Sequence, residues 1–270
     1  MDNPDNSKAL SGARRFFVDP ACISGDHVTI CGPQARQICT VLRLEVGDAI
    51  SALDGSGRCH IARLADVTSR QVTAEITAVI QLDTEPLVKL TLAQALTKGD
   101  KVELVVQKAT ELGISRMVIF TCERTVPVPD PARTARKLER WRAIAREAAE
   151  QSGRALVPEV RGVVGFHDLL AGRSGDELTL IAWEGEREMP LSRILAGANA
   201  GRIMLIVGPE GGFAEHEVKT ARDAGAIPVS FGKRILRSET AAIAGCAIIM
   251  HHAEDAIRAS EGIVTPAPEN

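Results

Sequence analysis

Two glycine-bearing loops near the C-terminal end constrain the fold of this chain more than any other feature of its sequence. The first, residues 208–212, reads Gly-Pro-Glu-Gly-Gly, and 24 residues separate it from the Arg-Ser-Glu-Thr-Ala motif at 237–241. Each loop follows an apolar, strand-like run, at 203–207 and 227–231, and precedes a helical pattern. Both loops are therefore expected at the carboxyl ends of strands, where open α/β sheets bind ligands.

Taken alone, the first loop has two interpretations. Its glycines can form a tight turn, or they can form a backbone cradle that lets a ligand approach closely. The second loop favours the cradle, because Lys233, Arg234 and Arg237 surround two apolar residues just before a helix. Glu239 stands where a carboxylate complements the helix dipole, so a capped, solvated helix start is the alternative interpretation.

Size and composition indicate a globular protein of about two domains, since the chain has 270 residues, 45% of them hydrophobic and 25% charged. No apolar run approaches the roughly 18 residues of a membrane span. The polar start lacks the apolar segment of a signal peptide, so a cytoplasmic protein is expected.

The six cysteines have no Cys-x-x-Cys pair and no regular spacing, which argues against zinc and against a disulfide framework. They are expected to be reduced packing residues. Cys246, His251 and His252 fall on one helical pattern without a complementary segment, so no metal site is expected.

Charge is unevenly distributed, although the net charge is only −3. Residues 87–161 carry 14 Lys/Arg against 9 Asp/Glu, and much of this excess falls on one predicted helix between Arg133 and Arg146. An RNA contact and a solvated helix face both explain the run, because glutamates are interspersed. Charge alone does not identify the partner.

The pattern along the chain predicts two architectures in succession. Residues 1–12 are expected to be a disordered leader, and 15–80 contain short alternating runs separated by glycine turns, which indicate a small barrel. A boundary is expected at 83–86. From residue 87 onward, strand-like and helical segments alternate, which predicts a largely parallel α/β sheet covered by helices.

The two loops, together with several other motifs, resemble the SPOUT superfamily of methyltransferases and, within it, the bacterial 16S ribosomal RNA (uracil-N3)-methyltransferase family. The resemblance covers almost the whole chain. Besides the loops, its motifs are Arg-Phe-Phe-Val at 15–18, Val-Leu-Arg-Leu at 41–44, Lys-Gly-Asp-Lys at 98–101, Gln-Lys-Ala-Thr-Glu-Leu-Gly at 107–113, Glu-Arg at 123–124 and Glu-Gln-Ser-Gly-Arg at 150–154.

This resemblance implies a small N-terminal PUA-like β-barrel at 13–83 that binds RNA, followed by a SPOUT-type α/β domain at 87–262 with a C-terminal trefoil knot. It also implies that backbone amides of the knot loops bind S-adenosylmethionine. The matching cofactor positions are Trp183, Glu184, Gly185, Val207, Gly208, Pro209, Glu210, Gly211, Gly212, Phe231, Gly232, Ile235, Leu236, Arg237, Thr240 and Ala241.

Other nucleotide-binding motifs do not fit these loops. The first glycine loop has no following Lys-Ser/Thr pair, so it cannot form a P-loop, and residues 55–57 lack the third glycine and the helix of a dinucleotide fingerprint. No Gly-x-Ser-x-Gly nucleophile elbow occurs either. A neutral cradle is compatible with a sulfonium cofactor.

Methylation of uridine N3 requires that its proton leave, which places negative charge on the flanking carbonyl oxygens. Arg237 is the first candidate to stabilise that charge, with Arg124 and Arg154 as supporting candidates. Glu239 is the nearest candidate base, while Glu210 and water remain alternatives.

The resemblance also implies partners. Candidate RNA-binding residues are Arg14, Arg15, Arg43, Lys98, Lys101, Lys108 and Arg154, with Arg124 as a further candidate, although ordinary surface charge explains any single one. Phe16 and Phe17 form the one aromatic pair, for which core packing is the better interpretation for at least one ring. A homodimer is implied, with Ile243, Ala247, Ile248 and Met250 assigned to its interface or to the core. The expected substrate is 16S ribosomal RNA within the 30S subunit.

Two residues depart from the family pattern. Ala214 replaces the usual Ser or Thr after Gly-Gly-Phe, which leaves Glu217 to support the helix start. Phe231 replaces the usual Leu and reshapes the expected adenine pocket. Two rival functions remain, namely a methyltransferase of the same fold that acts on another RNA site, and a non-catalytic RNA-binding assembly module.

Overall fold

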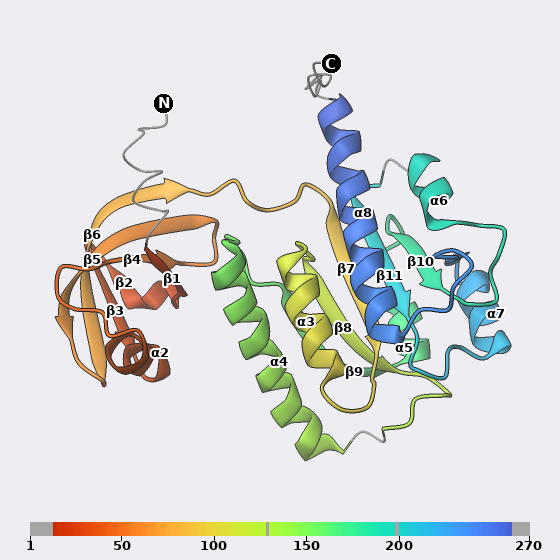
Figure 1. Cartoon of the computed structure of the whole chain (residues 1–270), viewed down its shortest axis with the longest axis horizontal. Coiled ribbons are helices and arrows are strands. Elements are labelled where there is room, and N and C mark those ends of the chain that lie inside the picture. Colours follow the sequence, from red (N-terminus) through yellow and green to blue (C-terminus); the bar gives the residue numbers. More distant parts are fainter. Residues whose placement is uncertain (1–12, 128–129, 198–199, 261–270) are drawn as a thin grey trace. The chain divides into compact units, whose positions relative to one another are not determined.

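A computed structural model describes residues 13–127, 130–197 and 200–260, and the predicted leader at 1–12 lies outside these ranges. The chain divides into two compact units (Figure 1). The first contains the residues up to Glu85 together with Ala149–Val157, and the second contains Pro86–Ala148 and the residues from Pro158 onward.

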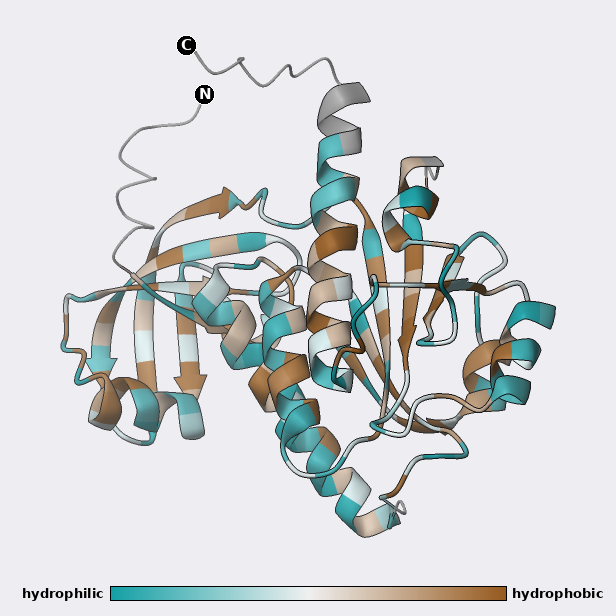
Figure 2. Cartoon of the chain, turned by 45° about the vertical axis from the view of Figure 1, so that its right-hand side comes forward, coloured by the Kyte–Doolittle hydropathy of each residue, from teal (hydrophilic) through white to brown (hydrophobic). Residues whose placement is uncertain are grey.

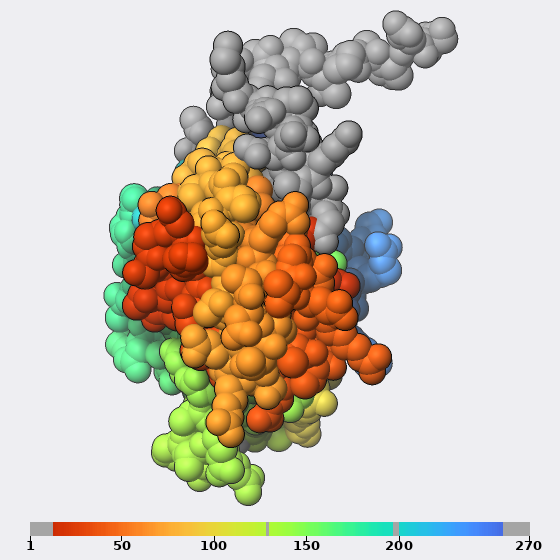
Figure 3. All heavy atoms as spheres, turned by 90° about the vertical axis from the view of Figure 1, so that its left-hand side faces the viewer, coloured from red at the N-terminus to blue at the C-terminus, as the bar shows by residue number. Residues whose placement is uncertain are grey.

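The first unit is built on one six-stranded sheet with the order β1-β4-β5-β6-β3-β2. The β1–β4 pair is parallel and the other pairs are antiparallel. Figure 3 shows β5 and β6 as a continuous orange surface. The elements are β1 (Arg14–Phe17), η1 (Pro20–Cys22), β2 (Ile23–Ser24), β3 (His27–Cys31), α2 (Pro33–Arg36), η2 (Gln37–Val41), β4 (Ala49–Leu53), β5 (Arg58–Val67) and β6 (Gln71–Gln81).

This sheet curls around a core. Phe16 of β1 and Ile30 of β3 belong to the same buried cluster, although three strands separate β1 from β3 in the sheet. Register shifts interrupt the β5–β6 pair at Ile61/Ala62 and Leu64/Asp66, and such bulges bend strands. The alternating pattern of the sequence thus corresponds to a curled sheet with one buried face.

The segment Ala149–Val157 covers the other face of this sheet. Ala149 and Val157 pack against Phe17 and Leu53, and the Phe17 amide donates to Glu150 Oε1 at 2.8 Å. Phe16 and Phe17 are 1% and 4% exposed, so both rings are core residues and neither forms a stacking surface.

Arg154 is buried beside Glu85 in this unit. Its Nη2 lies 2.5 Å from Glu85 Oε2, and the side chains are 6% and 22% exposed. Glu85 Oε1 also accepts hydrogen bonds from the amides of Ala155 and Leu156 at 2.9 and 3.1 Å. The pair therefore fixes the end of the covering segment to the last residue before the second unit.

Asp54 organises the turn between β4 and β5. Its Oδ1 accepts from the Ser56 amide at 2.9 Å and from the Ser56 hydroxyl at 2.6 Å, while Oδ2 lies 2.9 Å from Arg58 Nη2. Burial alone would raise the pKa of this carboxyl, but the Ser56 hydrogen bonds, His60 and Arg58 lower it to about 2. The ionised carboxylate therefore stabilises the turn.

We expect Asp54→Asn to destabilise the first unit by about 2 kcal/mol at pH 7, because the carboxyl pKa falls from 3.8 to about 2 on folding. In the wild type, this stabilisation is complete above pH 3.8 and is lost as the pH falls through 2. Urea unfolding followed by circular dichroism between pH 7 and 2.5 measures both effects. If acid lowers the unfolding free energy of the wild type and of Asp54→Asn equally, the lowered pKa of Asp54 does not stabilise this unit.

The second unit contains a parallel sheet with the order β12-β10-β11-β7-β8-β9. Its five strand pairs are all parallel, as the alternating pattern predicts. The strands are β7 (Lys89–Ala95), β8 (Arg116–Thr121), β9 (Glu159–Gly165), β10 (Leu178–Ala182), β11 (Arg202–Val207) and β12 (Ile227–Val229).

Helices cover both faces of this sheet. α3 and α8 pack together, and α8 contacts β7 and β11. On the opposite face, α5 and α7 contribute to a cluster that includes Phe120, Phe166 and Phe213. Figure 2 shows the hydrophobic strands between these helices. The helices are α3 (Lys101–Glu111), α4 (Pro131–Ser152), α5 (Phe166–Ala171), α6 (Leu191–Gly197), α7 (Glu215–Asp223) and α8 (Ser238–Ser260).

Three expectations need correction. The sequence did not predict β9, which pairs with β8 at the sheet edge. The predicted strand at 227–231 ends at Val229, so Phe231 belongs to the following loop. Cys31 is exposed and is therefore no packing residue, whereas Cys59 and Cys246 are buried.

Within the described residues, no helix is long and apolar enough to cross a membrane.

Candidate functional site

The reversal of strand order places a candidate site between β7 and β11. The chain builds β8 and β9 outward on one side of β7 and returns to build β10, β11 and β12 on the other side. Ligands bind at such switch points, outside the carboxyl ends of the strands. Gln94 of β7 pairs in register with Val207 of β11, and the first glycine loop begins at the next residue.

The hydroxyl of Ser238 joins the two glycine loops. Its Oγ donates to the carbonyl oxygen of Gly208 at 2.5 Å and accepts from Gln94 Nε2 at 2.9 Å. Ser238 and Gln94 are 6% and 1% exposed, so these bonds are sheltered from water. The sequence did not indicate these roles for Ser238 and Gln94, although Gln94 is a polar residue inside an apolar strand.

A charged cluster lies beside this junction. Lys101 Nζ is 2.8 Å from Glu210 Oε1 and 3.7 Å from Glu239 Oε2, and the Lys98 amide also donates to Glu210 at 3.3 Å. The hydrogen bond that Lys101 donates to Glu210 raises the pKa of Lys101, whereas the charge of Arg237 acts to lower it. Burial raises the pKa of Glu210, but the Lys101 and amide bonds outweigh it, so the net shift is downward. A lowered pKa makes Glu210 a weaker proton acceptor.

Glu239 has a different environment. Its side chain is 14% exposed, and Oε2 is buried without a hydrogen-bond partner within the described part of the chain. Glu239 lies in the first turn of α8, where a carboxylate complements the helix dipole, as the sequence predicts. The nearest charged group to this oxygen is Lys101 Nζ at 3.7 Å.

Glu217 connects the loop after β8 to the loop after β11. Its Oε2 accepts from the Ala214 amide at 3.0 Å, which confirms that it supports the helix start in place of a capping hydroxyl. Its Oε1 accepts from the Glu123 amide at 2.9 Å, a bond that the sequence did not suggest. Arg124, the next residue, donates from Nη1 to the Gly211 carbonyl at 3.0 Å.

The loop after β10 approaches the first glycine loop closely. Gly212 has φ +67°, and a Cβ there would collide with the carboxylate of Glu184. The ring of Trp183 occupies the space beside Gly185, and the Arg222 guanidinium lies 5.6 Å from the indole centroid. Glycines at 185 and 212 thus permit a compact junction between these loops.

The second glycine loop is largely open to solvent. Ile235 is 86% exposed, while Gly232, Arg237 and Thr240 are exposed and Leu236 is partly buried. Ala241 is buried at the start of α8. This loop therefore presents apolar and cationic side chains next to the sheltered junction at Ser238.

The residues predicted to bind RNA occur in both units. Arg14, Arg15, Arg43 and Arg154 lie in the first unit, whereas Lys98, Lys101 and Lys108 lie in the second. Lys108 is paired with Glu111 at 2.9 Å, and the burial of Arg154 was not anticipated. Arg43 is exposed with φ +53°, a rare conformation for a residue with a side chain.

Comparison with known families defines the class of protein. Residues 83–250 match the family described as RNA methyltransferase domain, and residues 30–77 match the family described as RNA methyltransferase PUA domain. These matches assign the sheet with the glycine loops to an RNA methyltransferase fold and the curled sheet to a PUA fold.

Individual relatives narrow the family. Ribosomal RNA small subunit methyltransferase E of Synechocystis sp. is 36% identical over 87% of this chain and 77% of its own length. The Bacillus subtilis protein of the same name is 33% identical over 84% and 90%. A crystal structure of this enzyme from Neisseria gonorrhoeae, bound to S-adenosyl methionine, matches with TM-score 0.80, 33% identity and coverage of 88% and 97%. The chain belongs to the ribosomal RNA small subunit methyltransferase E family.

Proposed function

We propose that this protein methylates a nucleotide of 16S ribosomal RNA with S-adenosylmethionine as donor, and that the methyl acceptor is N3 of a uridine in the decoding region. The observation that carries the proposal is the junction of two glycine loops at the switch point of a family-matched methyltransferase sheet. Residues 13–83 would bind RNA and residues 87–262 would hold the cofactor and perform the transfer.

The site residues fit this cofactor chemically. S-adenosylmethionine, when bound, supplies an electrophilic methyl group on a cationic sulfonium. Glu184 and Glu239 place carboxylates beside the loops, and Glu210 adds a third that Lys101 partly neutralises. The backbone of residues 208–212 and 231–241 offers the amides and carbonyls that would hold an uncharged nucleoside.

The protein's own side chains would then control the proton and the charge on the uridine. Arg237 would stabilise the negative charge that develops on a carbonyl oxygen, and Arg124 would assist from the loop after β8. Glu239 Oε2 would accept the N3 proton, with water as the alternative acceptor. The lowered pKa of Glu210 favours a structural role for that residue.

We also propose that the C-terminal part of the second unit forms a trefoil knot. The segment that would be threaded includes Ser230, whose amide donates to the Met189 carbonyl at 2.9 Å and whose carbonyl accepts from the Leu191 amide at 3.1 Å. From there the chain returns from the edge strand β12 to the junction at Ser238, beside β7 and β11. A chain that passes from the edge strand to the centre of the sheet in this way supports threading of the segment through an earlier loop.

A homodimer that acts on the 30S subunit in the cytoplasm completes the proposal. Ile248 of α8 and Leu104 of α3 are each 42% exposed on two helices that pack together, which favours an apolar interface there. Met250, by contrast, is 4% exposed and belongs to the core. Light scattering on dilution tests the dimer, and a monomer at active concentrations would exclude it.

The decisive experiment is incubation with labelled S-adenosylmethionine and 30S subunits that lack this methyl group, followed by mass spectrometry of the RNA. N3-methyluridine in the decoding region is the expected product. Label at another nucleotide would retain the chemistry and change the target. An absence of both label and cofactor binding would leave a non-catalytic RNA-binding module.

We expect Ser238→Ala to weaken S-adenosylmethionine binding about tenfold, because the buried Gly208 carbonyl and Gln94 amide both lose a partner. Calorimetric titration measures the change. Ser115→Ala is a matched control, since that hydroxyl donates to the carbonyl of Leu90 near the amino end of β7, away from the glycine loops. Equal affinity in both variants would show that the junction does not shape the cofactor site.

A further inference from the structure

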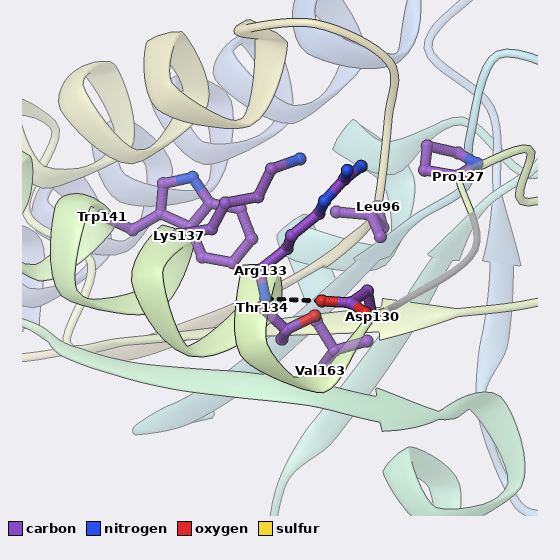
Figure 4. Close-up of a pocket in the computed structure, with 8 residues that line it drawn as sticks. All are labelled: Leu96, Pro127, Asp130, Arg133, Thr134, Lys137, Trp141 and Val163. Carbon is purple, nitrogen blue, oxygen red and sulfur yellow. Dashed lines mark hydrogen bonds between the residues drawn. The ribbon is translucent and has the colours of Figure 1, made fainter.

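Two adjoining cavities lie between the first half of α4 and the segment that follows β7 (Figure 4). The larger has a volume of about 320 Å³ and the smaller about 180 Å³. Both are lined by Leu96, Lys137 and Trp141, so they form one depression, which we call the α4 groove. The larger cavity falls within the size range of small-ligand sites.

Two cations of α4 border this groove. Arg133 and Lys137 lie one helical turn apart and are exposed, and Figure 4 shows that both side chains extend from the helix to the same side. Within the described residues, no ion pair joins either of them to a carboxylate, whereas Arg140 on the same helix is paired with Glu103 at 2.7 Å. These two charges are therefore available to an anion.

Two of the three carboxylates that line the groove, Asp130 and Glu103, already have a hydrogen-bond or ion-pair partner. Asp130 Oδ1 accepts from the Arg133 amide at 2.8 Å and caps the start of α4. Glu103 is held by Arg140, and Asp100 precedes α3. Among the described residues that line the groove, Arg133 and Lys137 are cations without an ion pair and Asp100 is the carboxylate without any such partner, so the charge that lacks a partner is net positive.

The inner wall of the groove contains a polar atom that needs a partner. Thr97 is 2% exposed and lines the smaller cavity, and its Oγ1 forms no hydrogen bond within the described part of the chain. Burying a hydroxyl without a partner is costly. Beside it, Trp141 lines both cavities but is only 2% exposed, so its side chain forms part of the groove floor and offers no stacking surface. A ligand that carries an anion and a hydrogen-bonding group would fit this groove.

One stretch of chain, residues 94–101, contributes both to the groove and to the contacts of the glycine loops. Gln94 binds Ser238, and the amide of Lys98 and the ammonium of Lys101 bind Glu210. Leu96 and Thr97, between these residues, line the groove. The groove is therefore next to the cofactor loops, within reach of a nucleotide that neighbours one bound there.

We propose that the α4 groove binds a nucleotide of the substrate RNA that flanks the methylated one. Its phosphate contacts Arg133 and Lys137, and its sugar or base edge bonds to Thr97. This inference rests on the proposed function, because it names a second contact for the same RNA. Recognition at this position is mainly of the backbone, with one hydrogen bond from Thr97.

The test compares three variants on one helix: Arg133→Ala, Lys137→Ala and Arg136→Ala. Arg136 is an exposed cation that does not line either cavity, so its removal matches the change in charge. Affinity for 30S subunits that lack the methyl group is measured at several salt concentrations. We expect Arg133→Ala and Lys137→Ala each to weaken binding about five- to tenfold and to reduce the salt slope by about 0.7, as for one single-strand phosphate contact. Arg136→Ala should change affinity less than twofold.

A fourth variant tests the hydrogen bond without altering charge. We expect Thr97→Val to weaken RNA binding about three- to tenfold with an unchanged salt slope, while S-adenosylmethionine affinity stays within twofold in all four variants. Equal losses in Lys137→Ala and Arg136→Ala, or none in either, would overturn the groove assignment even if the wild type methylates the subunits. Failure of the wild type to methylate any RNA would instead overturn the proposed function.

Discussion

Replacing Arg154 by alanine is expected to lower the opening free energy of the first unit by about 3–5 kcal/mol, because it removes one partner from a buried ion pair. Glu85 would keep the amides of Ala155 and Leu156 but lose the guanidinium that neutralises it. Hydrogen exchange of peptides from β4 to β6 measures this change within the first unit.

Arg161→Ala removes an ion pair of the second unit and should leave exchange in β4 to β6 unchanged. Arg161 pairs with Glu159 at 2.8 Å, but the two side chains are 53% and 50% exposed, and such surface pairs contribute about 0–1 kcal/mol. The double variant Glu85→Leu/Arg154→Leu should lose less than the two single losses combined, because no buried charge remains. A loss below about 1 kcal/mol for Arg154→Ala would show that its role lies outside the stability of this unit.

Arg237→Ala is expected to reduce kcat about 100- to 1,000-fold, the usual effect of removing one stabiliser of developing negative charge. The residue is exposed and close to Lys101 and Glu239, so its removal should leave folding intact. Single-turnover methylation of 30S subunits measures the rate, and calorimetry with S-adenosylmethionine separates chemistry from cofactor binding.

Arg234→Ala is the matched control for Arg237, since both are exposed arginines of the same loop. Arg237→Lys should recover part of the rate by retaining a cation. If Arg237→Ala loses cofactor affinity and keeps its rate at saturation, the guanidinium holds the cofactor and another group stabilises the uridine anion.

The sequence predicted the parallel sheet and the two loops correctly because long apolar runs and glycine motifs leave few alternatives. It did not predict β9, because Glu-Val-Arg-Gly-Val-Val-Gly contains two glycines and only a short apolar run. Both weaken a strand signal. The strand forms because its backbone completes the edge of β8.

Individual site residues were harder to assign than the site itself. Spacing located residues 208–212 and 237–241, but it could not indicate that the Ser238 hydroxyl bonds to Gly208 or that Glu217 reaches the Glu123 amide. These contacts join residues that are 30 and 94 positions apart. Arg154 shows the converse problem, since a basic residue in a surface-like motif is buried against Glu85.

The Ser238 hydroxyl also has a kinetic consequence. Because the Ser238 hydroxyl bonds both the Gly208 carbonyl after β11 and the Gln94 side chain near the end of β7, moving the second loop away breaks both hydrogen bonds at once. A bound nucleoside between the two loops would leave through a single concerted opening, and lid-type openings of this kind limit turnover in many enzymes.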